Sequence, residues 1–203
     1  MAEKEKKPSR LVNWLAEHPM RACVIVLSVI AMAAGLLLGG INELTYQSPE
    51  EKLAKNLNKA YATEGTWENV SLEGITVNSE DKSVSVTGAY KNENGADVVY
   101  IYTTTAKGYK SGLELMVVVK NDKIIKIMKT SSNETLGVEN NESFLSQFYN
   151  IDLTTIEGFR TNKQKTDGTE VNAVSSATKT SNAVAASVDL VVGYHKAIAG
   201  GAK

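Results

Sequence analysis

The side chains with the clearest chemical potential lie in one hydroxyl-rich run near the C-terminus, Val174-Ser175-Ser176-Ala177-Thr178-Lys179-Thr180-Ser181. An apolar run with few helix breakers follows, Asn182 to Ala199, so Thr180 and Ser181 are predicted to cap a helix there. Thr178 would then lie just before a helix N-terminus, where unpaired backbone N–H groups and the helix dipole favour a phosphate. The run therefore predicts either a phosphate-linked ligand on Thr178 or a ligand-free Ser/Thr cap.

An apolar segment near the N-terminus, Ala22 to Ile41, contains no charged residue and is long enough to span a bilayer. Basic residues precede it and the first one after it is Lys52, so the N-terminus is predicted to be cytoplasmic and the rest extracytoplasmic. A cleaved signal peptide is the alternative, because Ala31-Met32-Ala33 has the form of a cleavage site. The apolar run continues past that site, which favours a retained anchor. The basic residues that precede the segment are Lys4, Lys6, Lys7, Arg10 and Arg21.

The remaining chain predicts a helix followed by strands and further helices. Ser48-Pro49-Glu50-Glu51 has the residues of a helix start, and Asn141 is predicted to cap a short helix that holds Phe144, Leu145 and Phe148. A long C-terminal helix completes an α+β domain built on an antiparallel sheet. Short connections predict antiparallel neighbours, and the expected strands are 83–90, 98–105, 113–120 and 123–130. The predicted organisation is a tail 1–21, a transmembrane helix 22–41, a juxtamembrane linker helix 42–62 and an extracytoplasmic domain 63–203.

Composition argues against several other classes of protein. The 203 residues carry a formal net charge of −1, so no nucleic-acid partner is expected. The single cysteine, Cys23, excludes an intramolecular disulfide and a cysteine-based metal cluster. Two histidines are too few for a histidine-rich metal site, and His195 is expected to pack in the C-terminal helix. No metal site and no catalytic residue are predicted.

The hydroxyl-rich run resembles the flavinylation motif of the FMN-binding domain in two related proteins, RnfG of the Rnf complex and NqrC of the Na⁺-translocating NADH:quinone reductase. The family pattern is Asp-x-x-(Ser/Thr)-Gly-Ala-Thr-x-(Thr/Ser). Asn172 stands here in place of the Asp, and Ser176 in place of the Gly, where an added Cβ disfavours a positive φ. Lys107 to Gly112, Asn133 to Gly137 and Phe144 to Phe148 resemble further family segments in the same order. The length of the chain favours the RnfG type.

The resemblance implies that FMN is held through a phosphoester bond to Thr178, after transfer from FAD by a separate flavin transferase. Neighbouring hydroxyl groups would bind the phosphate, and Lys179 would offset part of its charge. A second loop would form a wall for the flavin, with Gly108 and Tyr109 as weaker candidates. The implied cofactor-binding residues are Thr178, Ser175, Ser176, Ala177, Lys179, Thr180, Glu134, Thr135, Leu136 and Gly137.

The implied function is electron transfer within a membrane-bound, ion-translocating ferredoxin:NAD⁺ oxidoreductase of the Rnf type. Its partners would be a second covalent-FMN subunit and iron–sulfur membrane subunits, and its location a cell membrane with the main domain extracytoplasmic. Two alternatives stay open. One is a membrane-anchored flavin carrier of another kind, such as a protein of the NqrC type. The other is a flavin-free extracytoplasmic binding module.

Overall fold

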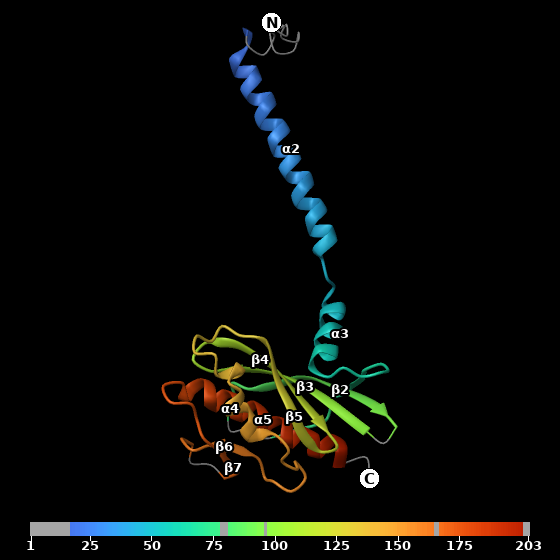
Figure 1. Ribbon diagram of the computed structural model, residues 1–203, viewed down its shortest axis with the longest axis vertical. Helices are drawn as coiled ribbons and strands as arrows, with labels where there is room; N and C mark the ends of the chain where they lie inside the picture. Colours follow the sequence, from blue (N-terminus) through green and yellow to red (C-terminus); the bar gives the residue numbers. More distant parts are fainter. Residues whose placement is uncertain (1–16, 78–80, 96, 165–166, 201–203) are drawn as a thin grey trace, which may run out of the picture. The chain divides into compact units, whose positions relative to one another are not determined.

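The computed structural model describes residues 17–77, 81–95, 97–164 and 167–200 (Figure 1). Its contacts divide the chain into two compact units, Met1–Pro49 and Glu50–Lys203. Four of the basic residues on which the predicted orientation rests, Lys4, Lys6, Lys7 and Arg10, lie outside the described residues.

The first unit contains one long helix, α2 (Pro19–Thr45, 27 residues). Proline suits the start of a helix because it lacks the N–H that would have no partner there. None of the residues of α2 is buried, and the helix extends past both ends of the predicted segment 22–41. At about 1.5 Å per residue it is roughly 40 Å long. By length and composition, α2 could cross a membrane once.

The second unit is built on a five-stranded antiparallel sheet whose spatial order follows the sequence. The four predicted strands are present, although each begins or ends a few residues from its expected bounds, and a fifth short strand precedes them. The α+β prediction is therefore confirmed. The strands are β1 (Glu68–Val70), β2 (Ser85–Asn94), β3 (Asp97–Lys107), β4 (Ser111–Lys120) and β5 (Lys123–Ser131).

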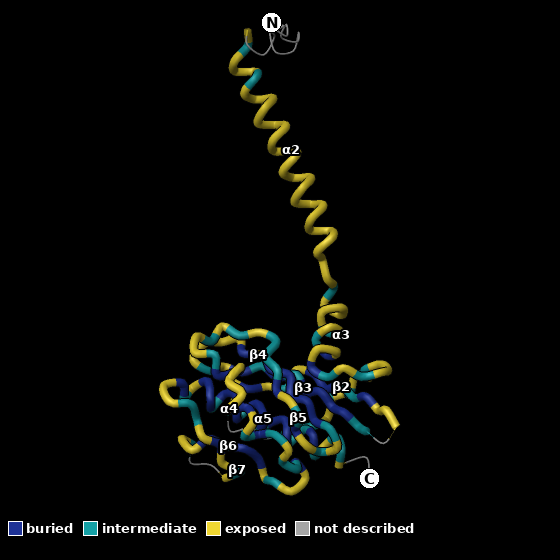
Figure 2. The backbone as a smooth tube through the Cα atoms, viewed as in Figure 1, coloured by how far each residue is buried: buried dark blue, intermediate teal, exposed yellow. Residues whose placement is uncertain are grey.

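A helix packs against each face of this sheet. Residues alternate along the central strands, so that Tyr100 and Tyr102 of β3 face the main core while Val99 and Ile101 face the other side. The main core is covered by α5 (Thr178–Gly200), and the second side by α3 (Pro49–Ala60) through Leu57 and Ala60. Figure 2 shows the buried residues concentrated in the strands and in α5.

Short elements link β5 to α5 and close the edge of the main core. They are η1 (Val138–Asn140), α4 (Glu142–Leu145), η2 (Ser146–Phe148), and the parallel strand pair β6 (Phe159–Thr161) and β7 (Thr169–Val171). The Asn141 side chain accepts a hydrogen bond from Phe144 N at 3.2 Å, which confirms the predicted cap. Phe144, Leu145 and Phe148 are all buried, so this segment contributes to the main core.

Candidate cofactor site

A tight turn presents the hydroxyl-rich run. Ala177 N donates to Val174 O at 3.1 Å, and Ser176, the third residue of this four-residue turn, has a φ of 67°. A positive φ at the third position is the mark of a type II turn, which favours glycine there. The family pattern has glycine at this position. This chain has a serine there, and the serine adopts the backbone conformation that glycine would favour.

Helix α5 begins at Thr178, so the prediction that Thr180 and Ser181 cap the helix is wrong. Ser181 acts from inside the first turn, where its hydroxyl donates to Ala177 O at 3.1 Å and accepts from Val174 N at 3.0 Å. These two bonds hold the preceding turn against the helix and let the helix start earlier. Thr178 is consequently the first helical residue.

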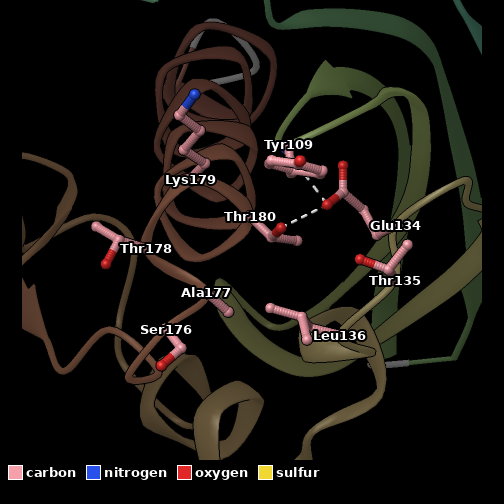
Figure 3. Close-up of a pocket in the computed structure, with 9 residues that line it drawn as sticks. All are labelled: Tyr109, Glu134, Thr135, Leu136, Ser176, Ala177, Thr178, Lys179 and Thr180. Atoms are coloured by element: carbon pink, nitrogen blue, oxygen red, sulfur yellow. Dashed lines mark hydrogen bonds between the residues drawn. The ribbon is translucent and has the colours of Figure 1, made fainter.

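A hollow of about 420 Å³ opens at this end of α5 (Figure 3). Its volume lies within the usual range of small-molecule sites. The structure brings together eight of the ten predicted cofactor-binding residues here, whereas Ser175 and Gly137 do not line the hollow. Tyr109, a weaker candidate from the sequence, does line it. The lining residues are Tyr109, Glu134, Thr135, Leu136, Ser176, Ala177, Thr178, Lys179 and Thr180.

Two apolar side chains at the hollow are unusually open to solvent. Tyr109 is 64% exposed and Leu136 is 62% exposed. Among the described residues of the second unit, they are the large hydrophobic side chains that are exposed. Exposed apolar surface that gathers at one hollow is typical of a ligand or partner site.

The start of α5 supplies the polar part of the hollow. The first N–H groups of a helix have no acceptor within the helix, and they attract anions. Thr178 is half-buried, and its hydroxyl makes no hydrogen bond to any residue that the structure describes. Lys179 is exposed, and its Nζ lies 5.9 Å from the centre of the Tyr109 ring. The first turn of α5 at this hollow therefore carries an acceptor hydroxyl, open amides and a cation.

The hydroxyl of Thr180 has a different partner from the one expected. It donates to Glu134 Oε2 at 2.5 Å, so its only proton is already used, and a bond to a phosphate would require this one to break. Glu134 also accepts from the backbone N–H groups of Tyr109 and Lys110. The sequence predicted Glu134 and Thr180 separately as cofactor-binding residues, but it gave no sign of the contact between them.

Asn172, which stands in place of the family Asp, is fixed by its neighbours. Its N–H donates to Gln147 Oε1 at 2.8 Å, and its carbonyl accepts from Gln147 Nε2 at 3.3 Å. Its side-chain oxygen accepts from Asn162 Nδ2 at 3.2 Å. A neutral acceptor is sufficient for these contacts, so the segment that leads to the turn is held without a carboxylate.

A known protein family matches the part of the chain that forms this hollow. Residues 108–192 match the family model described as FMN-binding domain. This segment is therefore similar to FMN-binding domains. All nine residues that line the hollow fall within it, so the match and the geometry indicate the same site. A search of curated proteins found no match. The FMN-binding domain indicates a flavin-binding electron carrier.

Proposed function

We propose that the chain is a membrane-anchored electron-transfer protein that holds FMN through a phosphoester bond to Thr178. The observation that carries the proposal is the meeting of two features in one hollow of the FMN-binding domain. A half-buried threonine hydroxyl with no described partner begins a 23-residue helix, and two exposed apolar side chains, Tyr109 and Leu136, lie at the same hollow.

The residues present suit the parts of FMN. The open amides of the first turn of α5 and the ammonium group of Lys179 favour the phosphate. The apolar surfaces of Tyr109 and Leu136 suit the isoalloxazine ring. FMN, when bound, supplies the redox chemistry of the protein. The chain itself supplies the attachment point, the walls that exclude water from one side of the ring, and the anchor.

Attachment would be a group transfer carried out by a separate Mg²⁺-dependent flavin transferase. The Thr178 Oγ1–P bond forms as the pyrophosphate bond of FAD breaks, AMP leaves, and the hydroxyl proton is released. Because Thr178 is only half-buried and follows closely on the exposed residues Ser175 and Ser176, its hydroxyl is open to an enzyme. A covalent bond keeps the cofactor in place in a compartment that holds little free flavin.

The larger assembly that we propose is an Rnf-type ferredoxin:NAD⁺ oxidoreductase coupled to ion movement. The chain would relay electrons on the extracytoplasmic side, next to a second covalent-FMN subunit and iron–sulfur membrane subunits. The order of family-like segments and the apolar helix α2 support this assignment. A carrier of the NqrC type would have the same kind of domain, so the proteins that co-purify with the full chain decide between the two.

The test is the intact mass of the full chain, produced with a flavin transferase, beside Thr178→Ala and Thr178→Ser. We expect an FMN-sized mass increment in the wild type, none in Thr178→Ala, and retention in Thr178→Ser, because serine keeps an acceptor hydroxyl. Circular dichroism of Thr178→Ala provides the control for folding. The absence of an increment in the wild type, with transferase and FAD supplied, would refute covalent attachment.

A further inference from the structure

The carboxylate of Glu134 joins three segments that are distant in the sequence. Its Oε2 accepts from Thr180 Oγ1 at 2.5 Å and from Tyr109 N at 3.3 Å, and its Oε1 accepts from Lys110 N at 2.8 Å. Figure 3 shows Glu134 beside Tyr109 and Thr180, joined to each by a dashed line. Hydrogen bonds to an ionised group are stronger than those between neutral groups. Glu134 therefore links the loop 108–110 to the first turn of α5.

Close packing at Gly108 reinforces this link. A Cβ added at Gly108 would lie 2.8 Å from Glu134 Oε1 and 3.1 Å from Thr180 Cα. The loop thus approaches the helix backbone at a distance that a larger residue would prevent. A further hydrogen bond, from Asn133 Nδ2 to Ser111 O at 3.0 Å, holds the segment of Glu134 to the other end of the loop.

Tyr109 depends on this link because its own side chain is not held by the core. Its ring is mostly exposed, and the described contact of that ring is with Lys179 Nζ at 5.9 Å. The backbone N–H bond to Glu134 is what sets the position of Tyr109 relative to α5. Both carboxylate oxygens of Glu134 already have donors from the protein, so its role is to hold the wall of the hollow.

We propose that Glu134 is a positioning residue of the flavin site, which latches the loop 108–110 to Thr180 so that Tyr109 forms a fixed wall for the isoalloxazine ring. This inference rests on the proposed function. A bond at Thr178 fixes only the phosphate end of FMN, and the flexible ribityl chain leaves the ring free to move. A rigid wall is what would hold the ring in one orientation for electron transfer.

Four variants separate the effect of the hydrogen bonds at Glu134 from the effect of side-chain size. Glu134→Ala removes all three hydrogen bonds, and Thr180→Val removes the hydroxyl with little change in shape. Thr180→Ser keeps the hydroxyl. Glu134→Gln keeps an acceptor for Lys110 N, and its amide can donate to Thr180 Oγ1, but that amide cannot accept from Tyr109 N, so two of the three hydrogen bonds survive. All four are made in the full chain, and near-ultraviolet circular dichroism checks that each is folded.

The first measurement is hydrogen exchange of the loop 108–112 in flavin-free protein. The loss of one charge-assisted hydrogen bond corresponds to about a tenfold shift between closed and open loop. We expect about that increase in exchange in Thr180→Val, which loses one hydrogen bond, and a larger one in Glu134→Ala, which loses three. Thr180→Ser should stay near wild type, and Glu134→Gln should fall between wild type and Glu134→Ala. Unchanged exchange in Glu134→Ala and Thr180→Val would overturn the latch, whether or not flavin is attached.

The second measurement is fluorescence anisotropy and iodide quenching of the attached flavin. We expect the two disrupted variants to carry FMN on Thr178 but to hold the ring more loosely, with lower anisotropy and greater quenching than wild type. Thr180→Ser should restore both signals. If wild type is loaded and all variants give the same signals, the positioning role is refuted while the proposed function stands. If wild type accepts no FMN, both fail.

Discussion

The variant Ser176→Gly tests how the chain presents its attachment site. Ser176 adopts a φ of 67° in the turn before α5, a conformation that L-residues with a Cβ adopt only at a cost. The side chain is exposed, and its hydroxyl makes no hydrogen bond to a described residue. Glycine therefore removes strain from the turn without removing a contact.

The expected gain follows from two opposing effects. A non-glycine residue in the left-handed region costs about 1–2 kcal/mol, whereas glycine loses about 0.5–1 kcal/mol more conformational entropy than alanine on folding. We expect Ser176→Gly to raise the free energy of unfolding by about 0.5–1 kcal/mol. For a domain of this size the melting temperature should rise by roughly 1–4 °C.

The assay is thermal unfolding of the full chain in detergent, followed by the near-ultraviolet circular dichroism of the aromatic residues. Ser176→Ala is the matched control, because it removes the hydroxyl and keeps the Cβ, and its free energy of unfolding should stay within about 0.5 kcal/mol of wild type. A Ser176→Gly protein that melts at or below the temperature of Ser176→Ala would show that the turn stores no such strain.

Three further variants test other contacts. Burial lowers the pKa of His195, although its hydrogen bond to Asp122 opposes the shift, so protonation favours the unfolded chain. The melting temperature should fall as the pH drops below about 6.5, and less steeply in His195→Gln, in a series of melting curves from pH 8 to 5. Lys126→Met removes the ammonium that donates to the last carbonyls of α3 at 3.0 and 3.1 Å, and urea unfolding should show a loss of about 0.5–1 kcal/mol. Gly108→Ala places a methyl 3.1 Å from Thr180 Cα, and the same assay should show a loss of about 1–3 kcal/mol.

Local signals in the sequence predicted the sheet well. The connection Asn121-Asp122 between the last two strands is an example, because both residues tolerate a left-handed backbone and have φ values of 48° and 64°. Alternating or β-branched runs gave the strands β2 to β5, and Asn141 gave the cap of α4. In each case the deciding interaction lies within a few residues along the chain.

Contacts between distant residues could not be predicted in the same way. Thr180 and Glu134 are 46 residues apart, and their hydrogen bond exists because the sheet and α5 bring two loops together. The strands β6 and β7 have three residues each, too few to show a period. Asp189 of α5 holds this pair by accepting from Phe159 N at 2.9 Å, a contact that depends on the tertiary fold.

The residues in the first turn of α5 favour binding of an anion, and they do little to stabilise the helix on their own. It contains no acidic residue, although a helix N-terminus favours negative charge, and it carries Lys179 there instead. Glu134 contacts this turn through its hydrogen bond from Thr180. Its carboxylate also accepts hydrogen bonds from the backbone of Tyr109 and Lys110. A phosphate ester on Thr178 would supply the missing negative charge beside both the open amides and the lysine. The same local sequence that weakens the helix start would then stabilise it once the cofactor is attached.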